Sequence, residues 1–397
     1  MKKVFLCIVA ALCLLPLVCA FASQPLADML VYENEEYVNG VTLDALELKD
    51  GVLLVGASEY MDSGWMAFLE PEGGKRWSYS EERSDLFLCP TPLAGGGFSV
   101  LRKRSVEESG SMGGYQASDL VFLNRKGKIV DEISLMQSTE WLIADADGYY
   151  AIGYYPVTAP SEDNEMGAMR PLLSRLDSKG FSLWSLEYTN PDYSSMTFLK
   201  GAMAEDSIII IGDAYNIKNQ AHVGLIHRVD LTGNVIWTNE SALGKSSFIN
   251  DFCVTGDGLI AGIYTDIAYN EEDDIGESLC SVFLMNMDGE VLWEHALEKG
   301  LMLDYILPVA GGFLCGSRGL DMENCPYIGD GWLLLLDRNG MVMAADSTPN
   351  IAGGKYELFG ITKNADGEAL LYGTLLDEPG FPGSPFVARL NFPEAYR

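Results

Sequence analysis

The side chains that most often carry chemistry are few and scattered in this chain. Among its 397 residues there are only three histidines, His222, His227 and His295. His222 and His227 lie five positions apart, and in a strand that spacing places them on opposite faces, so they do not form a pair. We interpret all three histidines as surface or edge residues. No Gly-x-Ser-x-Gly sequence is present to indicate a hydrolase nucleophile.

Three short stretches resemble phosphate-binding or calcium-binding motifs, but the spacing of their residues does not match those motifs. Gly-Lys-Ser at 244–246 resembles the end of a phosphate-binding loop, but Asn239 occupies the place of the required earlier glycine. The Asp-Gly stretches at 145–148 and 364–367 resemble calcium loops, yet they lack the full ligand spacing. Both fall where a tight turn is expected in any case. We therefore assign turn chemistry to them and predict no metal and no other cofactor.

The elements that must position any functional residue are set by one repeated turn. Asp230 opens this turn and Gly233 closes it, with a strand on either side. The turn recurs about every fifty residues, a period typical of propeller blades. Its other copies are Glu70/Gly73, Asn124/Gly127, Asp177/Gly180, Asn286/Gly289 and Asp337/Gly340. A tryptophan stands four residues after the glycine in four units, at Trp77, Trp184, Trp237 and Trp293.

A second landmark lies upstream of each turn, where a break, usually at a glycine, is followed by a short apolar strand. Together the two landmarks give seven units of four short strands, here named a to d in chain order. We predict an all-β fold, a seven-bladed β-propeller of four-stranded antiparallel blades. An eight-bladed count is the alternative.

The seventh unit lacks its last strand. Pro385–Leu390 supplies its c strand and Asn391 occupies the turn position, but too few residues follow for a d strand. An apolar stretch, Met29–Tyr32, precedes the first unit and belongs to none. We predict that this N-terminal strand pairs in the last blade and closes the ring, which removes free edges. The alternative is a disordered leader.

The Asp-x-x-Gly-x-x-x-Trp repeat resembles the repeats of bacterial exported β-propellers of the quinoprotein-like (PQQ-like) and WD-repeat-like type, over nearly the whole mature chain. The resemblance implies that the four tryptophans are structural residues that pack between neighbouring blades. Asp131 and Ala344 stand where the second and sixth units would carry a tryptophan. Quinone-binding members often show an adjacent Cys-Cys pair, and its absence here argues against a quinoprotein dehydrogenase. Propellers host many unrelated activities, so the resemblance implies no particular one.

Residues 1–22 have the character of a secretory signal peptide. A basic start is followed by an apolar run and by small residues that offer cleavage after Ala20 or Ala22. Cleavage would leave a single propeller domain over 23–397, with no membrane span. Cys19 invites a lipid anchor, but the bulky valine before it fits that signal poorly. We expect an exported protein that is secreted, periplasmic or associated with the cell envelope.

Five cysteines follow the leader, an odd number that leaves at least one without an intramolecular partner. Cys89, Cys253 and Cys280 lie in apolar strand patterns, and we interpret them as small buried hydrophobes. Cys315 and Cys325 flank one predicted loop, so they form the candidate disulfide in an oxidising compartment. The alternative is that Cys315 points into the core and Cys325 is a free loop thiol.

The charge and the predicted topology together suggest a binding protein. With 57 acidic against 26 basic residues, the net charge of −31 disfavours nucleic acid and anionic lipid as partners. In a propeller the a–b and c–d turns share one face, the turn face, and the longer b–c connections lie on the other, the loop face. The candidate binding residues are Tyr115, Met166, Tyr269, Glu271, Glu272, Asp273, Asp274 and Tyr327. The alternative is that these loops are merely tolerated insertions.

We therefore expect an exported, non-catalytic binding or scaffolding propeller that engages a protein, a peptide or a glycan through its loop face, as a monomer. An exported hydrolase or lyase that uses loop carboxylates is the alternative. No catalytic residues can be chosen for it, because any carboxylate pair among 57 acidic residues would be arbitrary. A quinoprotein-like enzyme with a bound cofactor is a weaker third hypothesis.

Overall fold

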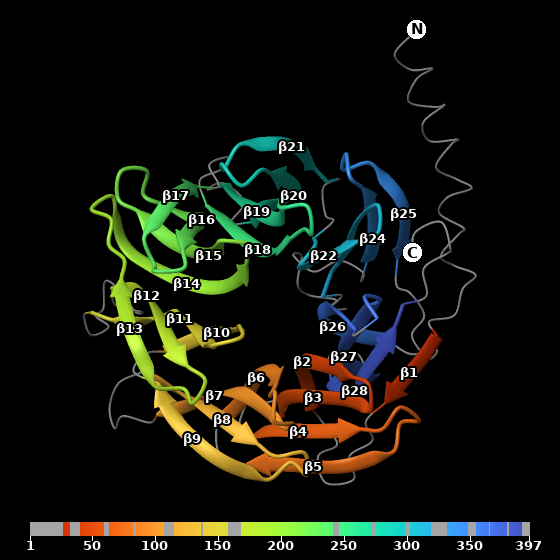
Figure 1. The fold of residues 1–397 in the computed structure, drawn as a ribbon. Coiled ribbons are helices and arrows are strands. Elements are labelled where there is room, and N and C mark those ends of the chain that lie inside the picture. The colour runs from red at the N-terminus through yellow and green to blue at the C-terminus, as the bar shows by residue number, and fades with distance from the viewer. Residues whose placement is uncertain are drawn as a thin grey trace, which may run out of the picture.

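A computed structural model describes residues 27–31, 40–58, 63–81, 85–106, 115–135, 138–157, 168–240, 246–270, 275–297, 302–318, 332–347, 355–364, 366–378 and 381–390. These residues form seven four-stranded antiparallel sheets, which stand as blades around a common axis (Figure 1). The fold is a seven-bladed β-propeller, which confirms the prediction from the repeated turn. None of the described residues belongs to a helix with the length and apolar character needed to span a bilayer.

In blades 1 to 6 the strands run outward from the axis in chain order, and in blade 7 the first strand of the chain is outermost (Figure 1). Blade 1 holds β2 (Gly40–Leu48), β3 (Gly51–Ser58), β4 (Gly64–Leu69) and β5 (Lys75–Glu81). Blade 2 holds β6 (Asp85–Pro92), β7 (Phe98–Val106), β8 (Tyr115–Leu123) and β9 (Ile129–Leu135). Blade 3 holds β10 (Ser138–Ala144), β11 (Gly148–Pro156), β12 (Met169–Asp177) and β13 (Ser182–Glu187). Blade 4 holds β14 (Tyr193–Met203), β15 (Ser207–Asn216), β16 (Ala221–Asp230) and β17 (Val235–Glu240).

The remaining blades follow the same order. Blade 5 holds β18 (Ser247–Val254), β19 (Ile260–Asn270), β20 (Ile275–Met285) and β21 (Val291–Ala296). Blade 6 holds β22 (Tyr305–Val309), β23 (Gly312–Gly316), β24 (Trp332–Asp337) and β25 (Val342–Ser347). Blade 7 holds β26 (Lys355–Lys363), β27 (Ala369–Glu378), β28 (Phe381–Arg389) and, as its outermost strand, β1 (Ala27–Val31).

The ring is closed by the two ends of the chain. β1 pairs antiparallel with β28, and Met29 lies opposite Ala388. This pairing confirms that the apolar stretch before the first unit supplies the missing strand. Blade 7 then packs against blade 1, and the hydroxyl of Thr374 donates a hydrogen bond of 2.9 Å to the carbonyl of Gly40 across that boundary.

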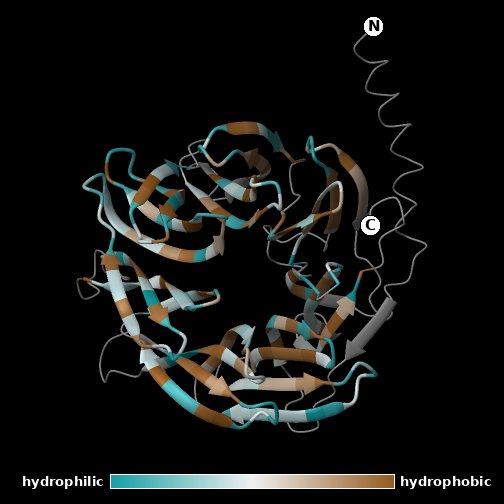
Figure 2. Cartoon of the chain, viewed as in Figure 1, coloured by the Kyte–Doolittle hydropathy of each residue, from teal (hydrophilic) through white to brown (hydrophobic). Residues whose placement is uncertain are grey.

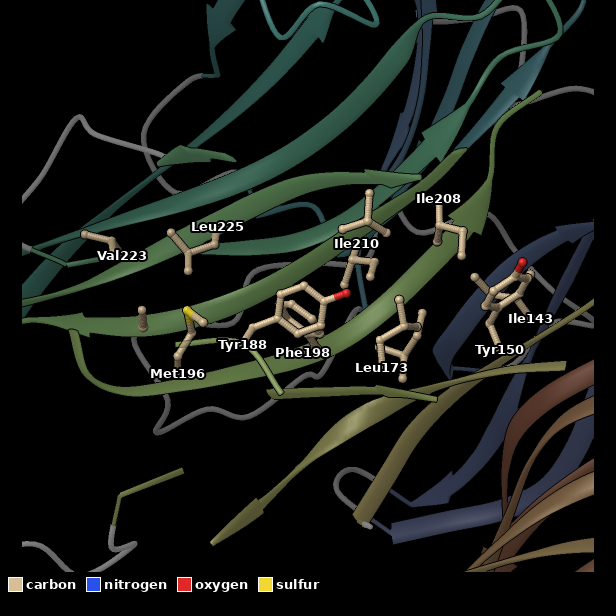
Figure 3. Close-up of a cluster of buried hydrophobic side chains, with 13 residues drawn as sticks. Ile143, Tyr150, Leu173, Tyr188, Met196, Phe198, Ile208, Ile210, Val223 and Leu225 are labelled. Carbon is tan, nitrogen blue, oxygen red and sulfur yellow. The ribbon is translucent and has the colours of Figure 1, made fainter. Parts of the chain in front are cut away.

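The core is divided into seven hydrophobic clusters, one at each boundary between neighbouring blades. The alternation of side chains along a strand explains this division. In β15, Ile208 and Ile210 face blade 3, whereas Ile209 and Ile211 face blade 5. Figure 3 shows the boundary between blades 3 and 4, and Figure 2 shows apolar strand segments separated by hydrophilic turns.

The repeated turn has the hydrogen bonds that its sequence predicts. The N–H of Gly233 donates to the carbonyl of Asp230 at 2.9 Å, and the glycine adopts a φ of 88°. One carboxylate oxygen of Asp230 accepts from the backbone N–H groups of Thr232 and Asn234, at 2.8 and 2.9 Å. Hydrogen bonds from the Asn234 and Thr232 side chains, together with these backbone bonds, lower the pKa of Asp230 to about 2.

The tryptophan of one blade packs on the turn glycine of the next. The Trp77 indole N–H donates to the carbonyl of Arg125 at 3.2 Å, and a Cβ placed on Gly127 would overlap the Trp77 ring. Trp237 repeats the contact with the carbonyl of Met287 at 2.8 Å, in the turn closed by Gly289. The turn glycine and the tryptophan of the repeat are therefore partners across a blade boundary.

The other tryptophan positions follow the same geometry with local changes. Trp293 donates to the carbonyl of Arg338 at 2.9 Å, and Trp184 lies against Gly233. In the second unit, where Asp131 replaces the tryptophan, Ile133 packs against the glycine of the next turn. A Cβ on that glycine, Gly180, would lie 3.3 Å from the Ile133 side chain. All four tryptophans are half-buried.

Candidate functional site

The candidate functional site is the set of side chains that the innermost strands place around the axis. Five of these strands carry a β-bulge at the same level. A bulge adds one residue to one strand and re-aims the side chains beside it. The residues that follow the five bulges are Asp44, Trp141, Lys200, Asp251 and Gly360.

Glycines in the second strands allow four of these five bulges to form. A Cβ on Gly212 would overlap the backbone carbonyl of Thr197 in the neighbouring inner strand, so only glycine permits this approach. The same overlap occurs at Gly56, Gly153 and Gly373. Sequence reasoning missed this feature, although the signal is visible in these four units as a glycine that ends the short apolar strand after the break.

Lys200 and Asp251 form a charged pair that links blades 4 and 5. The Nζ of Lys200 lies 2.6 Å from Oδ1 of Asp251, and the other carboxylate oxygen accepts from the N–H of Ile306 in blade 6 at 3.0 Å. Lys200 also lies over the Trp141 ring in blade 3, 4.9 Å from its centroid. Burial alone would lower the pKa of Lys200, but the charges of Asp251 and Asp44 outweigh burial and raise it.

Asp44 holds the matching position in blade 1. Its two oxygens accept from the N–H groups of Ala45 and Cys89, at 2.8 and 3.0 Å. Cys89 has a φ of 51°, an uncommon left-handed conformation for a residue other than glycine. Despite these bonds and one from the Tyr372 hydroxyl, burial raises the pKa of Asp44 to about 6.

Two tyrosines complete the set. Gly360, the residue after the bulge in blade 7, has no side chain, and a Cβ there would overlap the hydroxyl of Tyr372. The Tyr372 side chain, from β27, therefore takes this position in blade 7. Tyr305 starts the inner strand of blade 6. Burial raises the pKa of both phenols, so they act as hydrogen-bond donors at neutral pH. We call the seven side chains the inner ring: Asp44, Cys89, Trp141, Lys200, Asp251, Tyr305 and Tyr372.

The charged and phenolic members of the inner ring interact with one another electrostatically. Lys200 interacts with Asp251 and Asp44, and the Tyr372 phenol interacts with Asp44, Tyr305, Asp251 and Cys89. Such a set of donors and acceptors can hold a small polar ligand on the axis by hydrogen bonds. In the part of the chain that the structure describes, no group of three His, Cys, Asp or Glu residues is placed to hold a metal ion.

The interpretation of all histidines as surface or edge residues is wrong for His227. This residue shares a face of β16 with the buried Leu225 and Val229, and only 4% of its surface is exposed. Its ring lies 5.0 Å from that of Phe198, and Nδ1 is 2.8 Å from the Thr238 hydroxyl. Burial lowers the pKa of His227 to about 4, so the ring is neutral at physiological pH. His222 and His295 are exposed.

The predicted binding-face residues lie at or beyond the ends of the long hairpins. Tyr115 is the first residue of β8, and Tyr269 is the last residue but one of β19. Met166, Glu271, Glu272, Asp273, Asp274 and Tyr327 lie outside the described residues. The b–c connection of blade 5 is shorter than the long loop expected on this face, because the β19–β20 ladder continues to the pair formed by Asn270 and Ile275.

The cysteines of the described residues are buried. Cys89, Cys253 and Cys280 lie in the core, as their apolar surroundings in the sequence predict. Cys315 is fully buried in the cluster between blades 5 and 6 and forms no disulfide with another cysteine of the described residues. Cys325 lies outside the described residues, so its pairing with Cys315 stays a prediction.

Comparisons with known proteins agree with the propeller class. No protein-family model matches the chain, and no curated protein is significantly similar to it in sequence. Among solved structures, BamB from Moraxella catarrhalis is similar over 92% of this chain and 99% of its own, with 16% identity and a TM-score of 0.51. At this identity the similarity shows the fold alone.

Two further structures are less similar. The extracellular domains 1–2 of Drosophila semaphorin 1b match over 92% of this chain and 87% of their own, at 8% identity and a TM-score of 0.49. A puromycin hydrolase matches over 89% of this chain and 53% of its own, at 11% identity and a TM-score of 0.46.

Proposed function

We propose that this chain is an exported binding propeller that engages a protein, a peptide or a glycan through its loop face. The observation that carries the proposal is the unequal length of its hairpins. β19 and β20 each have 11 residues, whereas β23 and β24 of the next blade have five and six. At ~3.3 Å per residue, the described strands of the blade 5 hairpin are on the order of 15–20 Å longer than those of blade 6.

Blade 2 projects in the same direction. Its β7–β8 ladder extends to the pair formed by Val106 and Tyr115. Blades 2 and 5 lie on opposite sides of the ring, so their hairpins stand on opposite sides of the axis (Figure 1). Projecting loops on a rigid scaffold are a common site of recognition. The charge of −31 favours a basic or neutral partner for them.

The proposed export agrees with the position of the closing strand. Cleavage after Ala20 or Ala22 would remove the leader and leave β1, which begins at Ala27, intact. We also propose that the chain is monomeric and that its blades are of the bacterial quinoprotein-like or WD-like type. N-terminal sequencing of the mature protein checks the cleavage site directly.

The experiment compares two variants that each remove four carboxylates. In the loop-face variant, residues 271–274 are replaced by Asn-Gly, which suits a two-residue hairpin turn. In the control, four exposed acids of the turn face become amides: Asp147, Glu205, Asp288 and Asp366. Each protein is immobilised, exposed to envelope extract and culture medium from the source cells, and its bound partners are quantified by mass spectrometry. A partner lost only with the loop-face variant supports the proposal, and partners retained equally by both variants contradict it.

An exported hydrolase or lyase is the second candidate, and one observation favours it. Asp44 is half-buried with a pKa raised to about 6, a value suited to a general acid or base near neutral pH. Chromogenic ester, peptide and glycoside substrates would test the purified protein. Turnover that disappears in Asp44→Asn would replace the binding proposal with the enzymatic one.

A further inference from the structure

A groove on the outer wall of the propeller lies between blades 4 and 5. Its cavity measures about 340 Å³, close to the lower limit of small-ligand sites. Ile249, Phe283 and Met285 supply apolar surface, and the carboxylates of Glu240 and Glu294 supply charge. No lysine or arginine is among the residues that line this groove. The lining therefore combines an apolar surface with two negative groups.

Both glutamates are held in place by tyrosine hydroxyls. The Tyr264 hydroxyl donates to Oε1 of Glu294 at 2.6 Å, and the Tyr193 hydroxyl donates to Oε1 of Glu240. Burial, followed by the adjacent carboxylate, raises the pKa of each phenol, so both remain donors at neutral pH. Each bond occupies Oε1, and a carboxylate has a second oxygen that can accept from a ligand.

A third carboxyl group adds negative charge near the groove. Asp266 is 9% exposed, and its Oδ1 has no hydrogen-bond partner in the structure. It interacts electrostatically with Glu294. Burial and Glu294 raise the pKa of Asp266, which is the response expected where negative groups gather with no cation close by. A cation bound in the groove would relieve this repulsion.

The corresponding groove between blades 2 and 3 differs in character. Its cavity measures about 170 Å³, and its polar lining consists of serines such as Ser134, Ser182 and Ser185. The two grooves occupy the same place in the repeat, and of the two only the groove between blades 4 and 5 has carboxylates in its lining. This difference provides an internal comparison for the chemistry of the site.

We propose that the groove between blades 4 and 5 binds a lysine or arginine side chain presented by a partner polypeptide. The aliphatic stem of that side chain packs on Phe283 and Met285, and its cationic head pairs with Glu240 and Glu294. The groove is lined by the outermost strands of the two blades, β17 and β21, and none of its lining residues belongs to the projecting end of the β19–β20 hairpin. It is therefore a second recognition surface, and it does not depend on the loop-face proposal.

The test uses two capped peptides, Gly-Leu-Lys-Leu-Gly and the same sequence with acetyl-lysine, which keeps the stem but removes the charge. Isothermal titration calorimetry measures their affinity for the full mature chain. We expect the lysine peptide to bind at least tenfold more tightly than the acetylated one. Equal affinities, or no binding at about 5 mM peptide, would overturn the proposal.

Isosteric variants then assign the effect to the groove. E240Q/E294Q removes both carboxylates, and we expect it to weaken binding of the lysine peptide at least tenfold. E187Q/E205Q removes two exposed carboxylates elsewhere, and its affinity should stay within twofold of wild type. Equal losses in both double variants would show attraction by net charge alone and would refute a specific site. Circular dichroism of each variant confirms that the fold is retained.

Discussion

The innermost and the outermost strands of the same blades use the sequence repeat in opposite ways. After the inner bulges, the blades carry side chains as different as those of Asp44, Trp141 and Lys200. In the outer strands, the tryptophan and the glycine that it covers recur, as in Trp237 and Gly289. Four pairs of neighbouring blades meet through this tryptophan–glycine contact, so the same packing can be used at several boundaries.

The axis imposes a different condition, because the innermost strands of all seven blades surround it (Figure 1). Seven identical carboxylates or ammonium groups at this level would repel each other and shift their pKa values strongly. The inner ring instead combines opposite charges, as in the pair formed by Lys200 and Asp251. The comparison indicates that repetition is kept where blades join and lost where they converge. The following four predictions test this difference, from the largest expected effect to the smallest.

Breaking the charged pair of the inner ring should lower the free energy of unfolding more than any other change. Lys200→Met leaves the buried carboxylate of Asp251 without its cation, and we expect a loss of ~3 kcal/mol or more in the free energy of unfolding. Guanidinium denaturation measures this loss. Adding Asp251→Asn to the first change should restore most of the stability, because it removes the unpaired charge. A single variant within ~1 kcal/mol of wild type would show that the pair contributes little.

Substitution of Gly212, the glycine opposite the bulge in blade 4, should give the second largest loss of stability. Gly212→Ala forces a methyl group against the carbonyl of Thr197, and we expect a loss of ~2–3 kcal/mol as the two strands separate. Gly256→Ala is the matched control, because no atom lies within 4 Å of its added Cβ, and its effect should stay within ~0.5 kcal/mol. Similar losses in both variants would argue against a specific role for the close approach.

The outer contact should have a smaller effect at any one boundary. Trp237→Ala removes a half-buried indole and its hydrogen bond to the carbonyl of Met287, for an expected loss of ~2 kcal/mol. Trp237→Phe keeps part of the ring contact and should lose ~1 kcal/mol. Thermal unfolding shows which of the two variants is less stable. A phenylalanine variant as unstable as the alanine variant would assign the contact to the hydrogen bond instead of the ring.

The pH dependence of stability should have opposite signs in the two regions. The pKa of Asp44 is raised from 3.8 to about 6 in the fold, so its contribution is full below pH 4 and is lost as the pH rises through 6. Wild type should therefore lose ~1–2 kcal/mol relative to Asp44→Asn over this range, a value reduced for the partial exposure of the group. Urea denaturation at several pH values measures the difference.

Asp230 gives the opposite expectation. Its pKa is lowered from 3.8 to about 2, so its contribution is present above pH 4 and is lost as the pH falls through 2. Asp230→Asn should therefore differ from wild type mainly at neutral pH and approach it in acid. If stability changed with pH in the same direction through both aspartates, the proposed contrast between the inner ring and the repeated turn would be wrong.

The fold could be predicted from the sequence because its signals are local. The turn of Asp230 and Gly233 fixes two strands within ten residues, and its recurrence counts the blades. The inner ring could not be predicted, because its members are brought together by the closed ring. Lys200 and Asp251 are 51 positions apart, and only strand pairing shows that each follows a bulge. His227 was misjudged because its polarity concealed its place on the buried face of β16.

The closing strand also sets the order in which the molecule can be completed. Ala27 pairs with Arg389, so the last blade gains its fourth strand only after nearly the whole chain has been synthesised. Contacts between such distant residues form late, because a long loop must first be closed. In an exported chain, β28 would therefore present an unpaired edge until β1 reaches it. During that interval the unfinished propeller would be open to pairing with another copy and would benefit from a chaperone.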